Sequence, residues 1–374
     1  SMWNSSEVRP LEGFVFSVTP FNFSSIAANL PSSAAIMGNT GVWKPSRNSY
    51  LSNYFLMRLM MDAGLPDGVI NFVPGKASMV GDICLSHPML AGIHFTGSTS
   101  VFRQMWKDVA DNLASLRSYP RIVGETGGKD FIVAHPNCDH QALTVALIRG
   151  AFEYQGQKCS AASRAYIPES VWNSIKDNYV KEVAKISVGD PKDFSNFMAA
   201  VIDRKSFDNI AGYIDRAQQD SGCEIVTGGT YDDSTGYFVQ PTTIVCSDPK
   251  YESMAQEIFG PVLSIYVYPD HEFAETLKLC DETSEYALTG SIFATNREDI
   301  QTAMAALRYS AGNFYINDKP TGAVVGQQPF GGARGSGTND KAGSPLNLLR
   351  WVSPRSIKET FAPPHDWTYG FLNE

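Results

Sequence analysis

The sequence predicts an α/β fold with two parallel-sheet domains. Short apolar runs alternate with helical stretches over the first 170 or so residues, and many of the runs end at Pro, Gly or a polar residue. The 374 residues are 43% apolar and 18% charged, which is a globular composition long enough for roughly two or three domains. No window holds eighteen uninterrupted apolar residues, so no transmembrane helix is expected.

The first part of the chain predicts strands separated by helices, as in βαβ units with a parallel sheet. Pro31 is expected in the first turn of its helix, and Ser49 and Ser98 are expected as N-caps. The expected strands are 13–18, 41–43, 69–73, 92–95 and 121–123, and the expected helices are 27–37, 49–63, 76–85 and 98–116.

A second alternating stretch begins near Asp130. Its expected strands are 131–133 and 165–167, and its expected helices begin at the Asp139 cap and cover 169–186 and 206–221. Residues 224–268 are richer in Val, Ile, Thr and Tyr, and a glycine-rich stretch at 326–337 precedes a C-terminal strand at 357–360. The predicted division is 1–127, 128–335 and 336–374.

Charge and cysteine usage exclude several classes of protein. The 30 Lys and Arg residues against 39 Asp and Glu residues give a net charge of −9, with no basic stripe for nucleic acid. Six cysteines without a Cys-x-x-Cys pair indicate a reducing compartment rather than a disulfide scaffold. The opening Ser1-Met2 is interpreted as a tag remnant, so localisation is not read from this end.

Cys159 is the candidate nucleophile. A single Cys is usually a small buried hydrophobe, but residues 156–161 are small and polar with Lys158 adjacent, and the first turn of a helix is expected to follow. A nearby cation and a helix N-terminus both favour the thiolate.

Two polar residues follow predicted strands. Glu125 lies among glycines just past a strand end, where parallel sheets form ligand crevices. Asn22 follows another strand and offers an amide donor for an oxyanion hole. The alternatives are a solvated surface Glu and an Asx-turn Asn.

Phosphate and metal signals are weaker. There is no GxGxxG, and residues 332–338 resemble a P-loop but lack its Gly-Lys. Residues 96–98 run from a strand into a helix whose N-terminus can receive a pyrophosphate. His135, Cys138, Asp139 and His140 are interpreted as a strand-to-helix loop with Asp139 as the N-cap, and no metal site is expected.

Seven segments, in this order, resemble motifs of the aldehyde dehydrogenase superfamily. They are 20–23, 43–46, 95–98, 125–129, 156–159, 257–261 and 329–332. The resemblance covers about Leu11 to Thr360. The stretches 152–161 and 312–332 look most like the members that oxidise L-glutamate γ-semialdehyde to glutamate in proline catabolism.

The resemblance implies a Rossmann-like cofactor domain, an α/β catalytic domain and a mechanism. Cys159 attacks the aldehyde carbon, the Asn22 amide and the Cys159 N–H hold the oxyanion, hydride passes to NAD, and Glu125 activates water to release the acid. By position, the cofactor-binding residues are Lys44, Ser46, Gly97, Ser98, Glu257 and Phe259. The implied substrate-binding residues are Phe21, Lys158, Ser160, Gly322, Ala323 and Phe330.

Departures from the family pattern leave alternatives open. Arg47 stands near a position where many members carry an acidic residue, so NADP is the alternative to NAD. Relatives carry a long N-terminal segment that wraps the cofactor domain and supplies a strand of the oligomerisation flap; it is expected to be absent here, leaving exposed apolar surface. The alternative functions are oxidation of another carboxylate-bearing semialdehyde, such as succinate semialdehyde, and a folded but inactive truncated chain.

The expected partners are a small-molecule substrate and, in the full-length parent, further copies in a homodimer or higher homo-oligomer. Neither nucleic acid nor a membrane is expected. The expected location is the cytoplasm in a bacterium or the mitochondrial matrix in a eukaryote.

Overall fold

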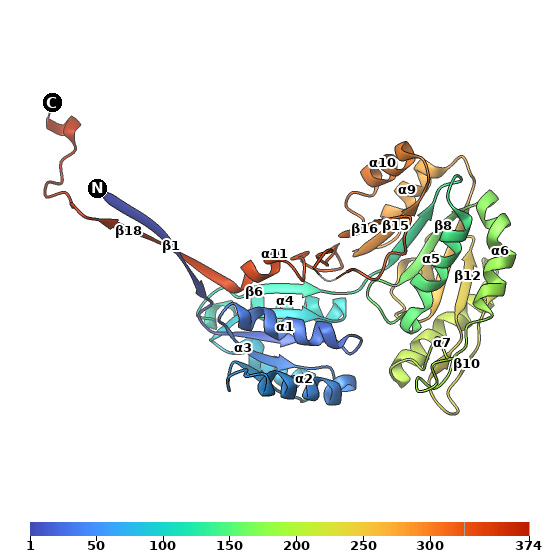
Figure 1. Ribbon diagram of the computed structural model, residues 1–374, viewed down its shortest axis with the longest axis horizontal. Coiled ribbons are helices and arrows are strands. Elements are labelled where there is room, and N and C mark those ends of the chain that lie inside the picture. The colour runs from blue at the N-terminus through green and yellow to red at the C-terminus, as the bar shows by residue number, and fades with distance from the viewer. Residues whose placement is uncertain (325, 374) are drawn as a thin grey trace.

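The structure is a computed structural model that describes residues 1–324 and 326–373. Two α/β lobes lie side by side, and a long two-stranded ribbon projects from one of them (Figure 1). Val325, which falls within the 312–332 stretch, lies outside the described residues.

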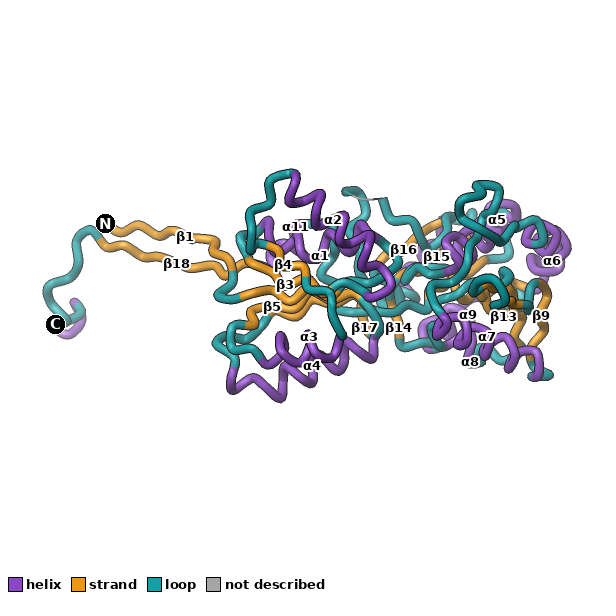
Figure 2. The backbone as a smooth tube through the Cα atoms, turned by 90° about the horizontal axis from the view of Figure 1, so that it is seen from below, coloured by secondary structure: helices purple, strands orange, loops and turns teal. Residues whose placement is uncertain are grey.

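The first lobe is built on a five-stranded parallel sheet in the order β4-β3-β2-β5-β6. Helices α1 and α2 cover one face and α3 and α4 the other (Figure 2). The strands are β2 (Phe14–Val18), β3 (Thr40–Lys44), β4 (Ile70–Phe72), β5 (Leu90–Thr96) and β6 (Arg121–Glu125). The helices are α1 (Ser24–Ile36), α2 (Tyr50–Asp62), α3 (Ala77–Ser86) and α4 (Thr99–Asn112), with short 3₁₀ turns at Arg47–Ser49 and Leu113–Ser115.

All five predicted strands and four predicted helices of this lobe are confirmed, but three details are wrong. Pro31 lies in the middle of α1 because the helix begins at Ser24, so one internal hydrogen bond is lost there. Ser49 and Ser98 occupy N-cap positions, yet neither side chain caps its helix. The Ser49 hydroxyl instead donates to the Ser46 carbonyl.

The second lobe is built on a seven-stranded sheet in the order β16-β15-β7-β8-β13-β12-β9, parallel except for the edge strand β9. Its strands are β7 (Asp130–Ala134), β8 (Ala162–Pro168), β9 (Cys223–Thr227), β12 (Thr242–Cys246), β13 (Val262–Tyr268), β15 (Thr289–Phe293) and β16 (Asn313–Ile316). Its helices are α5 (His140–Phe152), α6 (Glu169–Val183), α7 (Arg204–Gln219), α8 (Glu252–Ala255), α9 (Phe273–Glu282) and α10 (Arg297–Ala306). Asp139 caps α5 as predicted, since its carboxylate accepts the Ala142 N–H at 3.0 Å.

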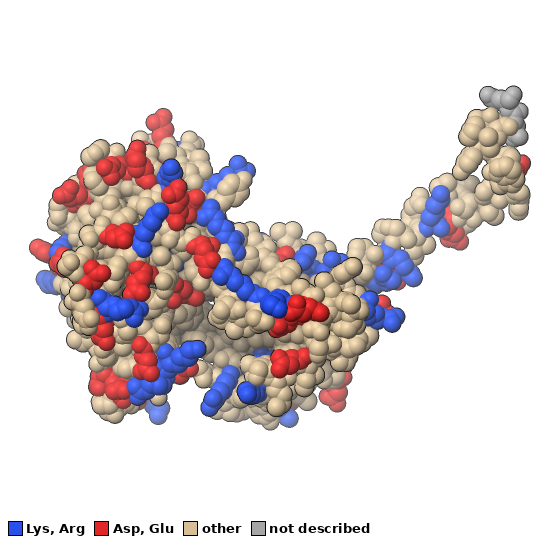
Figure 3. Space-filling model, turned by 180° about the vertical axis from the view of Figure 1, so that it is seen from behind, with Lys and Arg blue, Asp and Glu red and all other residues tan. Residues whose placement is uncertain are grey.

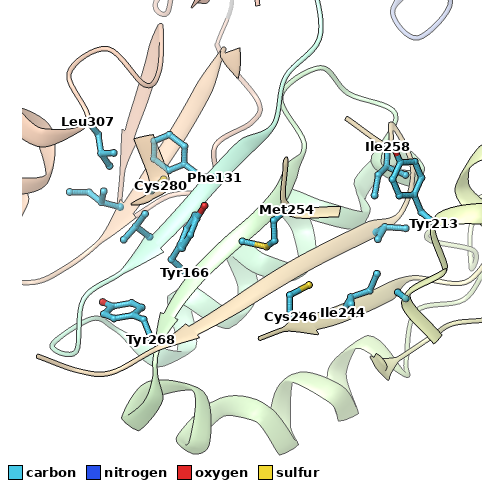
Figure 4. Close-up of a cluster of buried hydrophobic side chains, with 14 of the residues drawn as sticks. Phe131, Tyr166, Tyr213, Ile244, Cys246, Met254, Ile258, Tyr268, Cys280 and Leu307 are labelled. Carbon is cyan, nitrogen blue, oxygen red and sulfur yellow. The ribbon is translucent and has the colours of Figure 1, made fainter. Parts of the chain in front are cut away.

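The two faces of this sheet bury separate apolar clusters. Figure 4 shows one of them, in which Phe131, Tyr166 and Ile244 of the sheet meet Met254 and Leu307 from the helical side. Helices α5 and α6 cover the opposite face through residues such as Leu147 and Trp172. Burial on both faces explains the nearly continuous apolar character of β7 and β13.

Two short antiparallel strand pairs lie outside the two main sheets. They are β10 (Tyr231–Asp232) with β11 (Phe238–Val239), and β14 (Tyr286–Ala287) with β17 (Ala333–Arg334).

The residues that follow β17 return the chain to the first lobe. Gly337 then bridges to Glu125, and α11 (Pro345–Leu348) leads into a 3₁₀ turn that buries Trp351 completely. Trp351 packs with Val15, Ala34 and Val123, so the C-terminal segment completes the core of the first lobe.

The projecting ribbon pairs β1 (Met2–Pro10) with β18 (Val352–Thr360) in antiparallel register. A strand at 357–360 was predicted, and it begins five residues earlier than expected. Residues Met2–Pro10, which lie before the predicted start of the resemblance at Leu11, thus form one strand of the ribbon. The ribbon is exposed along nearly its whole length, and a 3₁₀ turn at Gly370–Asn373 follows it.

The surface is mixed in charge, with Lys and Arg interspersed among Asp and Glu over the face in Figure 3. Apolar side chains are exposed on all four helices of the first lobe. They are Ile36 on α1, Leu51, Tyr54, Phe55, Leu59 and Met61 on α2, Met79 and Ile83 on α3, and Val101 and Trp106 on α4. Among the described residues, no helix is both long and apolar enough to cross a bilayer.

Candidate active site

The predicted residues of the first lobe gather at one edge of its sheet because the strands are parallel. Asn22 follows β2, Lys44 ends β3, Ser98 follows β5, and Glu125 ends β6. Thr96 pairs with Glu125 and Val18 pairs with Lys44, so these ends lie at one level. Ligands bind at this edge in open α/β sheets.

Cys159 lies in a turn between α5 and β8. The expectation that a helix begins after it is wrong, because the residues that follow lead directly into strand β8. Two glycines permit the close backbone packing around this turn, because a side chain at either position would clash with a carbonyl oxygen. A Cβ on Gly156 (φ +64°) would lie 2.2 Å from the Gly260 carbonyl oxygen, and a Cβ on Gly128 would lie 2.3 Å from the Cys159 carbonyl oxygen.

The structure brings Cys159 and Glu125 together. The thiol donates to the carboxylate, with 3.6 Å between Sγ and Oε1. Burial raises the pKa of Glu125 to about 7, and the Cys159 hydrogen bond and the Lys341 charge oppose that shift. Burial, with a further contribution from the Glu125 charge, raises the pKa of the thiol well above its ordinary value. A carboxyl group with a pKa near 7 is well matched to general-base work.

Asn22 approaches the same turn from β2. Its amide Nδ2 donates to the Gln157 carbonyl at 3.0 Å, two residues before Cys159, and the side chain is 7% exposed. This bond ties the two lobes together and fixes the amide orientation. The amide carries a second N–H, so one donor remains for an oxyanion.

A cavity of about 390 Å³ opens beside Cys159 and Glu125. Five of the six predicted substrate residues line it: Lys158, Ser160, Gly322, Ala323 and Phe330. Ser160 and Thr321 hydroxyls contact each other at 2.8 Å, and Gly322 has φ +90°, a conformation that favours glycine.

Phe21, the sixth, is not among the lining residues. Its ring instead meets Phe259 edge to face, with 6.0 Å between the ring centres. Phe259 itself has a positive φ of 58°. The pair therefore joins the first lobe to the loop that carries Glu257.

The predicted cofactor residues present the groups that a dinucleotide needs. The first turn of α4, after Gly97 and Ser98, has no side-chain cap, so its N–H groups are available to a phosphate. Lys44 is buried at the end of β3, and that burial lowers its pKa. Ser46 precedes the 3₁₀ turn at Arg47–Ser49, and Arg47 is exposed.

Glu257 completes this side of the site. Its Oε1 accepts the Gly128 N–H at 3.0 Å, and a Cβ on Gly127 would lie 2.4 Å from Oε2. Burial raises the pKa of Glu257 to about 7, with the Gly128 hydrogen bond opposing the shift. The residues present therefore fit a dinucleotide along the carboxyl edge of the first sheet.

Sequence reasoning missed the residues that follow the glycine-rich stretch. Asn339, Asp340 and Lys341 line the cavity. Lys341 donates from Nζ to the carbonyls of Gly312 and Gly331, at 2.7 and 3.1 Å. The sequence did offer a signal for them, because Asn339, Asp340 and Lys341 form a run of polar residues just after the glycine-rich stretch at 326–337.

Residues 1–357 match the aldehyde dehydrogenase family, so the similarity begins before Leu11. The chain belongs to the aldehyde dehydrogenase family. It is 56% identical over 372 residues to the mitochondrial delta-1-pyrroline-5-carboxylate dehydrogenase of Dictyostelium discoideum, covering 99% of this chain and 67% of that protein. The human mitochondrial protein of the same name is 49% identical over 370 residues, covering 99% and 66%.

A crystal structure of the family member from Mycobacterium tuberculosis, a delta-pyrroline-5-carboxylate dehydrogenase bound with NAD, superimposes with a TM-score of 0.94 at 53% identity. The match covers 99% of this chain and 68% of that one. The chain thus spans about two thirds of the length of these relatives. The predicted α/β class with parallel sheets and the predicted family are both confirmed.

Proposed function

We propose that the chain carries the machinery for NAD-dependent oxidation of L-glutamate γ-semialdehyde, the open form of Δ1-pyrroline-5-carboxylate, to L-glutamate. The observation that carries the proposal is the cavity in which Cys159 and Glu125 lie beside Ser160, Gly322 and Ala323. The named relatives support this substrate over succinate semialdehyde.

The chemistry begins with the thiol. Glu125 accepts the Cys159 proton across their hydrogen bond, and the thiolate attacks the aldehyde carbon to form a thiohemiacetal. The free N–H of Asn22 and the Cys159 backbone N–H stabilise the new oxyanion, a contribution of about 3–4 kcal/mol. The bond from Asn22 to Gln157 keeps the amide in place while charge develops.

NAD, when bound, accepts hydride from the adduct, and the product on Cys159 is a thioester. Lys44, Ser46, Gly97 and Ser98 would hold the adenosine and pyrophosphate part, and Glu257 with Phe259 the nicotinamide ribose. Glu125 must first release the proton taken from Cys159 to solvent, which returns it to the carboxylate. It then takes a proton from water, which attacks the thioester, and the Cys159 sulfur leaves as the acid is released. One carboxyl group thus serves both proton transfers.

The substrate side follows from the anchor loop, defined here as Thr321–Ala323. Backbone N–H groups of Gly322 and Ala323 and the Ser160 hydroxyl would receive the α-carboxylate. Lys158 and Phe330 line the same cavity. Phe330 would flank the aliphatic part, together with Phe21, whose ring contacts that of Phe259. Backbone donors are fixed before binding, so little ordering entropy is lost.

The same proposal covers the organisation of the chain. Residues 1–127 form the dinucleotide-binding domain, 128–335 the catalytic domain, and 336–374 a bridging segment. Its strand β18, paired with β1 in the exposed ribbon, joins copies in a homodimer or larger assembly. The eukaryotic relatives are mitochondrial by name. The matrix is therefore the proposed location in a eukaryote and the cytoplasm in a bacterium.

The test is NADH formation from NAD and Δ1-pyrroline-5-carboxylate, followed by absorbance. Cys159→Ala is expected to abolish turnover. Cys223→Ser, a partly buried cysteine on β9, is the matched control and should retain it. Turnover that survives Cys159→Ala, or a wild-type chain that binds NAD yet leaves the substrate untouched, would refute the proposal.

A further inference from the structure

Glu153 lies at the end of α5 and gathers three cations. Its Oε1 accepts from Arg149 Nε at 2.7 Å, and its Oε2 accepts from Lys158 Nζ at 2.8 Å. Lys319 Nζ lies 3.6 Å from the same Oε2. The Lys158, Lys319 and Glu153 side chains are only 13%, 17% and 18% exposed. These four side chains are called the Glu153 cluster below.

The cluster carries more positive than negative charge. One carboxylate faces three cations, and the two ammonium groups share a single oxygen. Asp318, the residue directly before Lys319, is exposed, and its Oδ1 accepts the Lys319 backbone N–H at 2.8 Å. Because the ammonium groups are shielded from water, their field on a neighbouring anion is stronger than that of surface lysines.

Lys319 connects this charge to the anchor loop. Its Nζ donates to the Thr321 carbonyl at 3.3 Å, and a Cβ on Gly322 would lie 3.0 Å from it. Thr321 in turn contacts the Ser160 hydroxyl. Lys319 does not line the cavity itself, whereas Lys158, Ser160, Thr321 and Gly322 do. Its influence on a ligand must therefore act through the loop and through its field.

We propose that Lys319 is a positioning residue that makes the site selective for aldehydes bearing a carboxylate. Held by Glu153, its ammonium supports the Thr321–Gly322 backbone from behind and adds positive potential where the substrate carboxylate docks. Lys158 supplies the second charge from the cavity wall. This inference rests on the proposed function. It adds that Lys319, a residue that does not line the cavity, helps to determine which class of aldehyde the site accepts.

The experiment compares two aldehydes on the wild-type chain, Lys319→Met, Lys319→Arg and the control Lys278→Met. Glutamate semialdehyde carries a carboxylate and pentanal does not. Lys278 is a suitable control because it is 78% exposed and its partner is Glu282, at 3.9 Å. Inhibition of pentanal oxidation by L-glutamate reports carboxylate binding separately from chemistry on the semialdehyde.

Lys319→Met is expected to raise KM for glutamate semialdehyde and the inhibition constant of glutamate roughly tenfold, with kcat within about twofold. Pentanal kinetics should stay unchanged, Lys319→Arg should restore most of the loss, and Lys278→Met should resemble wild type. An equal loss with both aldehydes would show a merely structural role and overturn the inference. The inference would also be overturned if the ratio of kcat/KM for glutamate semialdehyde to kcat/KM for pentanal were the same in Lys319→Met as in wild type.

Failure of the proposed function is recognised first, in the wild-type chain. If wild type does not prefer glutamate semialdehyde over pentanal, the proposed substrate is wrong, and the inference falls with it. If the chain shows no turnover, the affinity for L-glutamate is measured instead, by calorimetric titration of wild type and Lys319→Met. Affinity reduced roughly tenfold by Lys319→Met supports the inference, and equal affinity in the two proteins overturns it.

Discussion

The thiol of Cys159 donates a hydrogen bond to the carboxylate of Glu125, with 3.6 Å between sulfur and oxygen. The two residues come from different lobes, since Glu125 ends β6 and Cys159 precedes β8. Each group affects the other: the Glu125 charge raises the pKa of the thiol, and the thiol hydrogen bond lowers that of Glu125. The first prediction concerns this pair.

Activity should rise as pH increases through about 7, because Glu125 works as a base only after losing its proton and burial raises its pKa to about 7. Glu125→Gln has no proton to lose and should lower kcat about 10²- to 10⁴-fold at pH 8. The measurement is kcat against pH from 5.5 to 9. A wild-type profile that stays flat down to pH 5.5 would contradict the prediction.

Asn22→Ala should lower kcat roughly 100-fold, because one of two oxyanion donors is lost. Affinity for NAD, measured by calorimetry, should stay within about twofold, since the Asn22 amide bonds to the cysteine turn through the Gln157 carbonyl. Asn22→Asp keeps the size of the side chain but has no donor at the carboxylate, so it should be at least as impaired. A loss below fivefold in both variants would mean that the amide only braces the Gln157 turn.

Lys44→Met should weaken NAD binding roughly tenfold, because it removes a charged hydrogen-bond donor at the end of β3. Arg47→Ala is the matched control: this side chain is exposed three residues later, and its loss should leave NAD affinity unchanged. Calorimetric titration with NAD and NADP measures both. If Arg47→Ala weakens NADP alone, the arginine contacts a 2′-phosphate; if Lys44→Met binds NAD normally, the assignment of Lys44 is wrong.

Trp351→Ala should lower the free energy of unfolding by about 3–5 kcal/mol, since the indole is fully buried. Its ring centre lies 4.8 Å from that of His94, with the two ring planes tilted by 42°, and an atom of the indole lies 2.9 Å from where a Gly92 Cβ would be. Trp367→Ala is the control, because that side chain is 84% exposed and its loss should change stability by less than about 0.5 kcal/mol. Denaturant unfolding followed by circular dichroism gives both values. Equal effects would show that the C-terminal segment is not part of the first lobe's core.

Local features of the sequence predicted most of the secondary structure. Helix periodicity, strand length and turn residues act within a few residues, so the strands from 14 to 125 and the Asp139 cap were found without tertiary information. Pro31 was misplaced because burial of α1 residues such as Ala27 and Leu30 extends the helix past a local breaker. Tertiary packing outweighs that local preference.

The sequence by itself determined the α/β class, the family, and the placement of Asn22, Lys44 and Glu125 at strand ends, because parallel strands share one carboxyl edge. Only the tertiary structure decided which distant segments meet. Asn39 donates to the Trp351 carbonyl across 312 positions, and Glu153 meets Lys319. Such contacts depend on how the chain crosses between the two sheets, and no spacing within one segment encodes that path.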